Sequence, residues 1–96
     1  MKPSDSLCQH HDAIRRVVEQ HRTTNPRVFG SVLHGLDREG SDLDLLVDPT
    51  PDTTLMDIAR IQNSLQKLLG IPVDVLTPKA LPEQFRAKVL AEARPV

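Results

Sequence analysis

Two aspartates, Asp42 and Asp44, interrupt the clearest strand pattern of this 96-residue chain, Ser41-Asp42-Leu43-Asp44-Leu45-Leu46-Val47. Residues two apart in a β-strand project from the same face, so an extended backbone would place these two carboxylates side by side. Two ionised carboxylates in such proximity repel each other and favour a counter-cation, and hard oxygen ligands suit Mg²⁺ or Mn²⁺. The pair alone leaves two interpretations open, a metal site and a solvated strand edge.

A third carboxylate, Asp74, interrupts a second apolar segment, Val73-Asp74-Val75-Leu76. Taken alone, it is typical of an exposed polar residue of a strand. If the two strands are neighbours in one sheet, however, Asp74 joins Asp42 and Asp44. Three carboxylates suit two metal ions roughly 3.5–4 Å apart, one activating the attacking oxygen and one holding phosphates. We therefore predict that Asp42, Asp44 and Asp74 are catalytic and bind two Mg²⁺ ions, with Mn²⁺ as the alternative.

Gly30 and Ser31 follow a short extended run, residues 27–29, and precede one predicted helical turn at 32–35. A glycine at such a junction lets the backbone approach a ligand closely. The N–H groups that open the turn would point at an anion, and the serine hydroxyl adds a donor. A Gly-Ser pair is usually an ordinary turn; its value here is that ten residues, 32–41, separate Ser31 from Asp42.

Gly30-Ser31, the ten intervening residues and Asp42-x-Asp44 together resemble the signature of the polymerase-beta-like nucleotidyltransferases. With Asp74 included, residues 8–96 resemble their minimal nucleotidyltransferase (MNT) family. The resemblance implies a nucleotidyltransferase fold and metal binding by Asp42 and Asp44. Asp74 would complete the site as a ligand and as the activator of the incoming hydroxyl, and Gly30 and Ser31 would bind the triphosphate of ATP.

The chain departs from this family pattern at His34, where many members carry an arginine shortly after the Gly-Ser pair. A histidine is at most partly charged near pH 7 and cannot form a bidentate fork to phosphate. Two interpretations stay open for His34: a single hydrogen bond to the nucleotide with reduced affinity or turnover, or no role at all.

The elements around these residues predict an α/β (α+β) fold, a small mixed three- to four-stranded sheet flanked by helices. Helices are expected at 5–22, 55–69 and 82–93, strands at 27–29, 41–47 and 71–76, and a polar loop at 37–40. Thr54 and Asp57 predict a capping box, and Gly70 a left-handed residue after that helix. The residues expected to be buried by the last two helices are Leu55, Ile58, Ala59, Ile61, Leu65, Leu68, Leu69, Phe85, Val89 and Leu90.

Length and composition narrow the class of protein. Ninety-six residues without a repeat or linker predict a single MNT domain spanning 1–96. A net charge of −1 and the lack of Trp and Tyr argue against direct nucleic-acid binding. The single cysteine, Cys8, excludes an intrachain disulfide framework. No apolar run approaches the roughly 18–20 residues of a membrane span, so we expect a cytoplasmic protein without membrane contact.

The acceptor of the transferred nucleotide is expected on another protein, because the catalytic unit occupies nearly the whole sequence. The MNT resemblance implies that this partner is a HEPN-domain ribonuclease toxin and that the chain is its antitoxin. It would neutralise the toxin by transferring AMP from ATP to a hydroxyl, with tyrosine as the expected acceptor. Two alternatives stay open, a non-catalytic antitoxin that acts by occlusion and a nucleotidyltransferase with a small-molecule acceptor.

Overall fold

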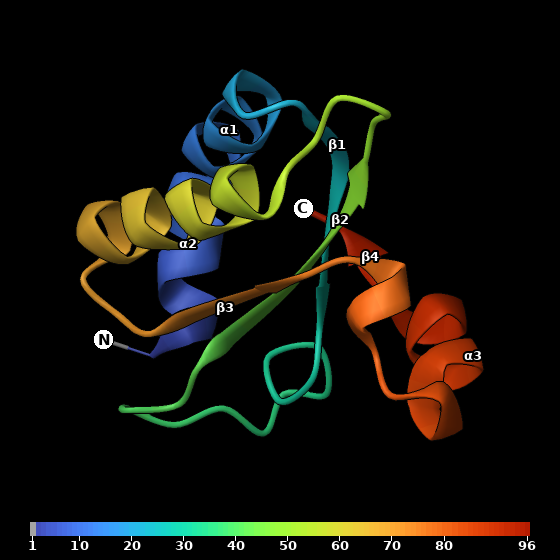
Figure 1. Cartoon of the computed structure of the whole chain (residues 1–96). Coiled ribbons are helices and arrows are strands. Elements are labelled where there is room, and N and C mark those ends of the chain that lie inside the picture. Colours follow the sequence, from blue (N-terminus) through green and yellow to red (C-terminus); the bar gives the residue numbers. More distant parts are fainter. Residues whose placement is uncertain (1) are drawn as a thin grey trace.

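The secondary structure follows the expected order of helices and strands. In the computed structural model, which describes residues 2–96, the elements are α1 (Pro3–Gln20), β1 (Thr23–Phe29), β2 (Leu43–Pro49), α2 (Leu55–Leu69), β3 (Val73–Leu76), the 3₁₀ helix η1 (Pro78–Ala80), α3 (Glu83–Glu92) and β4 (Arg94–Pro95). The sheet has the order β3-β2-β1-β4, with β1 antiparallel to β2 and β4, and β2 parallel to β3 (Figure 1). This arrangement confirms the predicted fold class.

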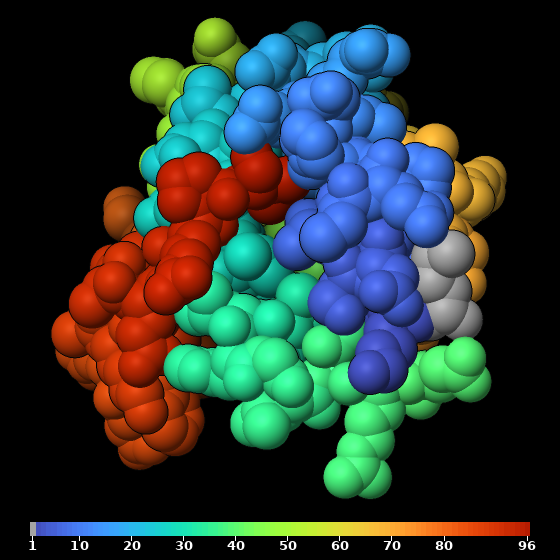
Figure 2. All heavy atoms as spheres, turned by 180° about the vertical axis from the view of Figure 1, so that it is seen from behind, coloured from blue at the N-terminus to red at the C-terminus, as the bar shows by residue number. Residues whose placement is uncertain are grey.

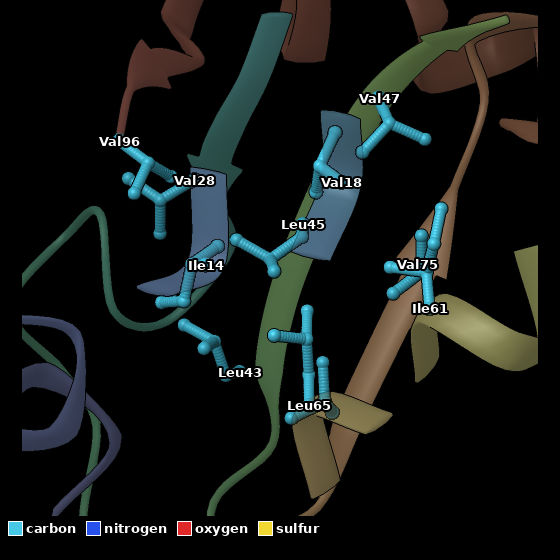
Figure 3. Packing of buried hydrophobic residues seen from close by; sticks show 11 residues of the cluster. Ile14, Val18, Val28, Leu43, Leu45, Val47, Ile61, Leu65, Val75 and Val96 are labelled. Atoms are coloured by element: carbon cyan, nitrogen blue, oxygen red, sulfur yellow. The ribbon is translucent and has the colours of Figure 1, made fainter. Parts of the chain in front are cut away.

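The core lies between the sheet and the two-helix layer of α1 and α2. Leu43, Leu45 and Val47 of β2 are fully buried, as the alternation in the sequence predicts. They lie with Ile14 and Val18 of α1 and Ile61 and Leu65 of α2 (Figure 3). Burying each such side chain contributes about 1.5–3 kcal/mol, so this face fixes the strand register and leaves Asp44 on the opposite face.

Helix α2 has the boundaries and caps that its sequence predicts. Thr54 Oγ1 accepts a hydrogen bond from Asp57 N at 3.2 Å, and Asp57 Oδ2 accepts one from Thr54 N at 2.9 Å. Gly70 follows in the left-handed conformation, with φ +68°. The predicted apolar stripe was too wide, because only a narrow face of the helix meets the sheet. Leu55, Ala59 and Leu68 are exposed.

The strand boundaries differ from the predicted ones. β1 begins at Thr23 rather than at residue 27, because a bulge with Asn25 at φ +53° accommodates Pro26 within the strand. β2 begins at Leu43 and continues through Pro49, so Asp42 precedes the strand instead of lying within it. β3 begins at Val73, two residues later than expected.

Helix α3 was expected to bury three apolar residues and does not. Phe85 is 55% exposed and Leu90 38% exposed, while Val89 is half-buried. The apolar residues of α3 do not gather on one face, and the helix lies apart from α1 and α2, beside η1 and β4 (Figure 1). Arg86 of α3 donates hydrogen bonds to the carbonyl oxygens of Pro78, Lys79 and Leu81 and so joins α3 to η1.

The end of the chain returns to the core. β4 pairs with Arg27 and Val28 of β1 and supplies the fourth strand that the sequence left open. Val96 is buried beside Val28, and its carbonyl oxygen accepts a hydrogen bond from Arg15 Nε of α1 at 2.6 Å. In Figure 2 this segment lies against α1 above the loop that follows β1. Within residues 2–96, no helix combines the length and apolar character of a membrane span.

Candidate active site

Gly30 lies directly against the carboxylate of Asp44. It follows Phe29, the residue of β1 that is paired with Asp44 of β2. Its φ is +75°, a conformation that favours glycine. A Cβ atom at this position would overlap Asp44 Oδ2 and touch Asp44 Cγ at 3.2 Å. Glycine at position 30 therefore suits the backbone conformation, and it leaves the Asp44 carboxylate in the place that a Cβ atom would take.

Asp44 and Asp74 are partners in the parallel pairing of β2 with β3. Adjacent strands lie about 4.8 Å apart, so the two side chains are neighbours on the sheet. The residues that flank them, including Leu43, Leu45, Val73 and Val75, are buried in the core, while both aspartates are half-buried. The structure thus confirms that the two strands are neighbours and that these carboxylates share the face away from α1 and α2.

The pKa of Asp44 is raised from 3.8 to about 6, first by burial and then by the negative charges of Asp74 and Asp42. Asp48, on the same face of β2, has partners that Asp44 lacks. It forms an ion pair with Arg27 and accepts a hydrogen bond from Asn25 Nδ2 at 3.0 Å. Within residues 2–96, none of the three site carboxylates forms a side-chain hydrogen bond or an ion pair. Asp44 is therefore a half-buried acid in a negative field, without an ion-pair partner among residues 2–96.

Asp42 is the most exposed of the three aspartates and the one that lies outside the sheet. Its side chain is exposed and lies ahead of the strand, although its charge reaches Asp44. In the part of the chain that is described, no group of three or more His, Cys, Asp or Glu side chains is arranged so that it could hold a metal ion. The structure brings Asp44 and Asp74 together, and Asp42 would have to turn toward them to complete a three-carboxylate site.

Ser31 opens a hydrogen-bonded turn, where the sequence predicted a helical turn at 32–35. His34 N donates to Gly30 O at 3.3 Å, Gly35 N to Val32 O at 3.2 Å and Leu36 N to Ser31 O at 2.9 Å. The N–H groups of Ser31, Val32 and Leu33 have no backbone acceptor within residues 2–96. Consecutive free N–H groups in a turn form an anion-binding concavity, and the Ser31 hydroxyl adds a further donor.

His34 contacts α3. Its Nε2 lies 3.2 Å from Glu92 Oε2, and both side chains are partly exposed. A pocket of about 330 Å³ adjoins this contact, lined by Leu33, His34, Ala91, Glu92, Ala93 and Arg94. Sequence reasoning found neither Glu92 nor Asp37, a buried carboxylate that binds Ser4 N. Their partners are distant in sequence, so no local spacing signals these contacts.

Comparison with known proteins agrees with this geometry. Residues 11–96 match the family model described as a nucleotidyltransferase domain. The chain is 31% identical over 77 residues to "Putative protein adenylyltransferase MJ0435" of Methanocaldococcus jannaschii, covering 80% of this chain and 83% of that protein. It is 35% identical over 65 residues to "Protein adenylyltransferase MntA" of Thermococcus cleftensis, covering 68% of this chain and 66% of that protein.

Solved structures show the same likeness. One described as "Structure of putative minimal nucleotidyltransferase" has a TM-score of 0.86 and 40% identity, with 97% of this chain and 95% of that chain covered. A toxin–antitoxin crystal structure with AMP-PNP has a TM-score of 0.74 at 16% identity, covering 88% and 69%, and shares the fold.

The family match and the fold define a nucleotidyltransferase domain. The chain belongs to the nucleotidyltransferase domain family, and among its solved relatives it is similar to a minimal nucleotidyltransferase over nearly its whole length.

Proposed function

We propose that this chain transfers AMP from ATP to a hydroxyl group of a partner protein. The observation that carries the proposal is the pairing of Asp44 with Asp74 beside Gly30, at the start of a turn with free N–H groups. The relatives named as protein adenylyltransferases support a protein acceptor. The partner in this proposal is a HEPN-domain ribonuclease toxin, modified on a tyrosine. This choice of partner is supported by the MNT resemblance and by a structural neighbour that is a toxin–antitoxin pair.

In this proposal the turn binds the triphosphate. The N–H groups of Ser31, Val32 and Leu33 and the Ser31 hydroxyl donate to phosphate oxygens. The acceptor oxygen bonds to the α-phosphorus while the bond to the pyrophosphate oxygen breaks. The hydroxyl proton passes to Asp74, which lies on the same face as Asp44.

The carboxylates fit a divalent cation by their chemistry. Asp44 and Asp74 offer hard oxygen atoms, they are close enough for repulsion to raise the pKa of Asp44, and no protein cation pairs with either within residues 2–96. In the proposal these two residues hold Mg²⁺ or Mn²⁺, and Asp42 joins them after turning inward. The bound ions would neutralise phosphate charge and lower the pKa of the attacking hydroxyl.

Two observations favour a second candidate, an antitoxin that acts by occlusion alone. The three aspartates are not arranged as a complete metal site within residues 2–96, and His34 replaces the usual arginine. In that case neutralisation of the partner needs neither ATP nor the carboxylates.

Intact-mass measurement of the partner separates the two candidates. The chain, ATP and Mg²⁺ are incubated with the product of the adjacent gene as the proposed toxin, and we expect a mass increase of one or more AMP units. The Asp44→Asn/Asp74→Asn variant should give no increase, while Asp52→Asn, a change at an exposed loop aspartate, should behave as the wild type. Neutralisation without any mass change, retained in the double variant, would establish occlusion instead.

A further inference from the structure

Asp37 is a buried carboxylate to which the proposed reaction gives no role. It is 7% exposed, and its Oδ2 accepts a hydrogen bond from Ser4 N at 2.9 Å. Within residues 2–96, helix α1 has no other side-chain cap: the N-cap residue Lys2 makes no capping bond. Asp37 thus caps α1 from a loop that is distant in sequence. In Figure 2 the start of α1 lies beside the segment that precedes β2.

Two closed turns meet at Asp37. On one side, Leu36 N donates to Ser31 O at 2.9 Å and closes the nucleotide-binding turn. On the other side, Arg38 N donates to Ser41 Oγ at 3.0 Å and Ser41 N donates to Arg38 O at 3.0 Å. Asp37 is the one residue between these turns. Ser31 begins the first turn and Asp42 follows the second. A fixed Asp37 therefore constrains the positions of both residues.

We propose that Asp37 is a positioning residue of the nucleotidyl-transfer site: by binding Ser4 N–H, it holds in place the two turns that carry Ser31 and Asp42. The inference rests on the proposed function. The contact suits a carboxylate, since the N-terminus of a helix carries partial positive charge. In agreement, the pKa of Asp37 is lowered, chiefly by the N–H of Ser4.

Three variants separate positioning from general stability. Asp37→Ala removes the acceptor, whereas Asp37→Asn keeps an oxygen that can accept from Ser4 N. Thr54→Ala is the matched control, because it also removes a side-chain cap from a helix start. Thr54 also lies away from the proposed site. It follows the end of β2 that is remote from Asp44, and the strand from Asp44 to Pro49 is about 17 Å long.

AMP transfer and hydrogen exchange are measured at a temperature where every variant is folded. We expect Asp37→Ala to lower kcat/KM for ATP by roughly tenfold or more through misplacement of the site. Asp37→Asn should stay within about threefold of wild type and Thr54→Ala within about twofold. Amide exchange across residues 30–42 should rise in Asp37→Ala and not in Thr54→Ala.

Two outcomes would overturn the inference. Either Asp37→Ala matches Thr54→Ala in both measurements, or Asp37→Asn is as impaired as Asp37→Ala. If Asp37→Ala does not fold, Asp37→Glu, which displaces the carboxylate by one methylene, replaces it with the same expectations. If the wild type transfers no AMP, the proposed function fails, and the exchange measurement alone still decides whether Asp37 holds residues 30–42.

Discussion

Replacing Gly30 with alanine probes the contact between the proposed nucleotide-binding turn and Asp44. The change has two separable effects. The first is a side chain on a left-handed backbone, which is unfavourable by roughly 1–2 kcal/mol. The second is the overlap of the new Cβ with Asp44 Oδ2. Gly70→Ala isolates the first effect, because Gly70 has a similar φ of +68° and no atom within 4 Å of the added Cβ.

The two variants should lose similar stability and differ in activity. For a domain of this size, each kcal/mol corresponds to about 4–8 °C in Tm. The overlap itself adds little to the stability loss, since a carboxylate at the end of a side chain can move aside by roughly 1 Å. A displacement of about 1 Å at the reacting groups, however, lowers the rate on the order of 100-fold. Gly30→Ala should therefore lose most AMP transfer, and Gly70→Ala should keep it.

Thermal unfolding followed by circular dichroism gives the stability of each variant, and the time course of AMP addition by intact mass gives kcat/KM. Both rates are measured well below the lower Tm. Equal transfer by Gly30→Ala and Gly70→Ala would refute the reasoning, since it would mean that the position of Asp44 beside Gly30 does not matter to the reaction.

Three further outcomes are expected. The pKa of Asp44 is about 6 in the folded chain against an ordinary value of 3.8, so the folded state holds this proton more tightly than the unfolded chain does. Without metal, stability should therefore fall on the order of 1 kcal/mol after solvent screening as pH rises between these two values. Asp44→Asn should remove this slope in urea unfolding with EDTA present, and an unchanged slope would exclude Asp44 as its source. At neutral pH, Mg²⁺ at 100 times its Kd should stabilise the wild type by about 2.7 kcal/mol. The Asp44→Asn/Asp74→Asn variant should show no such Tm increase, and an equal increase would place the ion elsewhere. Thr54→Ala should lower stability by about 1 kcal/mol, measured by thermal unfolding against Thr54→Ser, which keeps the hydroxyl and should unfold near the wild-type Tm.

Local patterns predicted the parts of the structure that depend on nearby residues. The alternation of Leu43, Leu45 and Val47 with Asp44 is a property of one strand, and the capping box of Thr54 belongs to one helix start. The pairing of Asp44 with Asp74 required one further assumption, that the strands before and after α2 are neighbours. A strand–helix–strand connection commonly satisfies that assumption.

Contacts between distant segments were beyond the reach of these patterns. Residues 83–92 form the expected helix, but a local pattern does not reveal that Phe85 is exposed. The exclusion of Asp42 from β2 depends on where the loop leaves the sheet. The loop contacts of Asp37 with Ser4 and of His34 with Glu92 join segments that share no periodic pattern.

The most direct test of the site is a crystal structure of the chain with Mn²⁺ and a non-hydrolysable ATP analogue, with Mn²⁺ located by its anomalous scattering. We predict an anomalous peak between the carboxylates of Asp44 and Asp74, and the triphosphate bound by the N–H groups of the turn at Ser31. A nucleotide bound away from this turn, or an anomalous map without a peak at Asp44 and Asp74, would contradict the assignment of the active site.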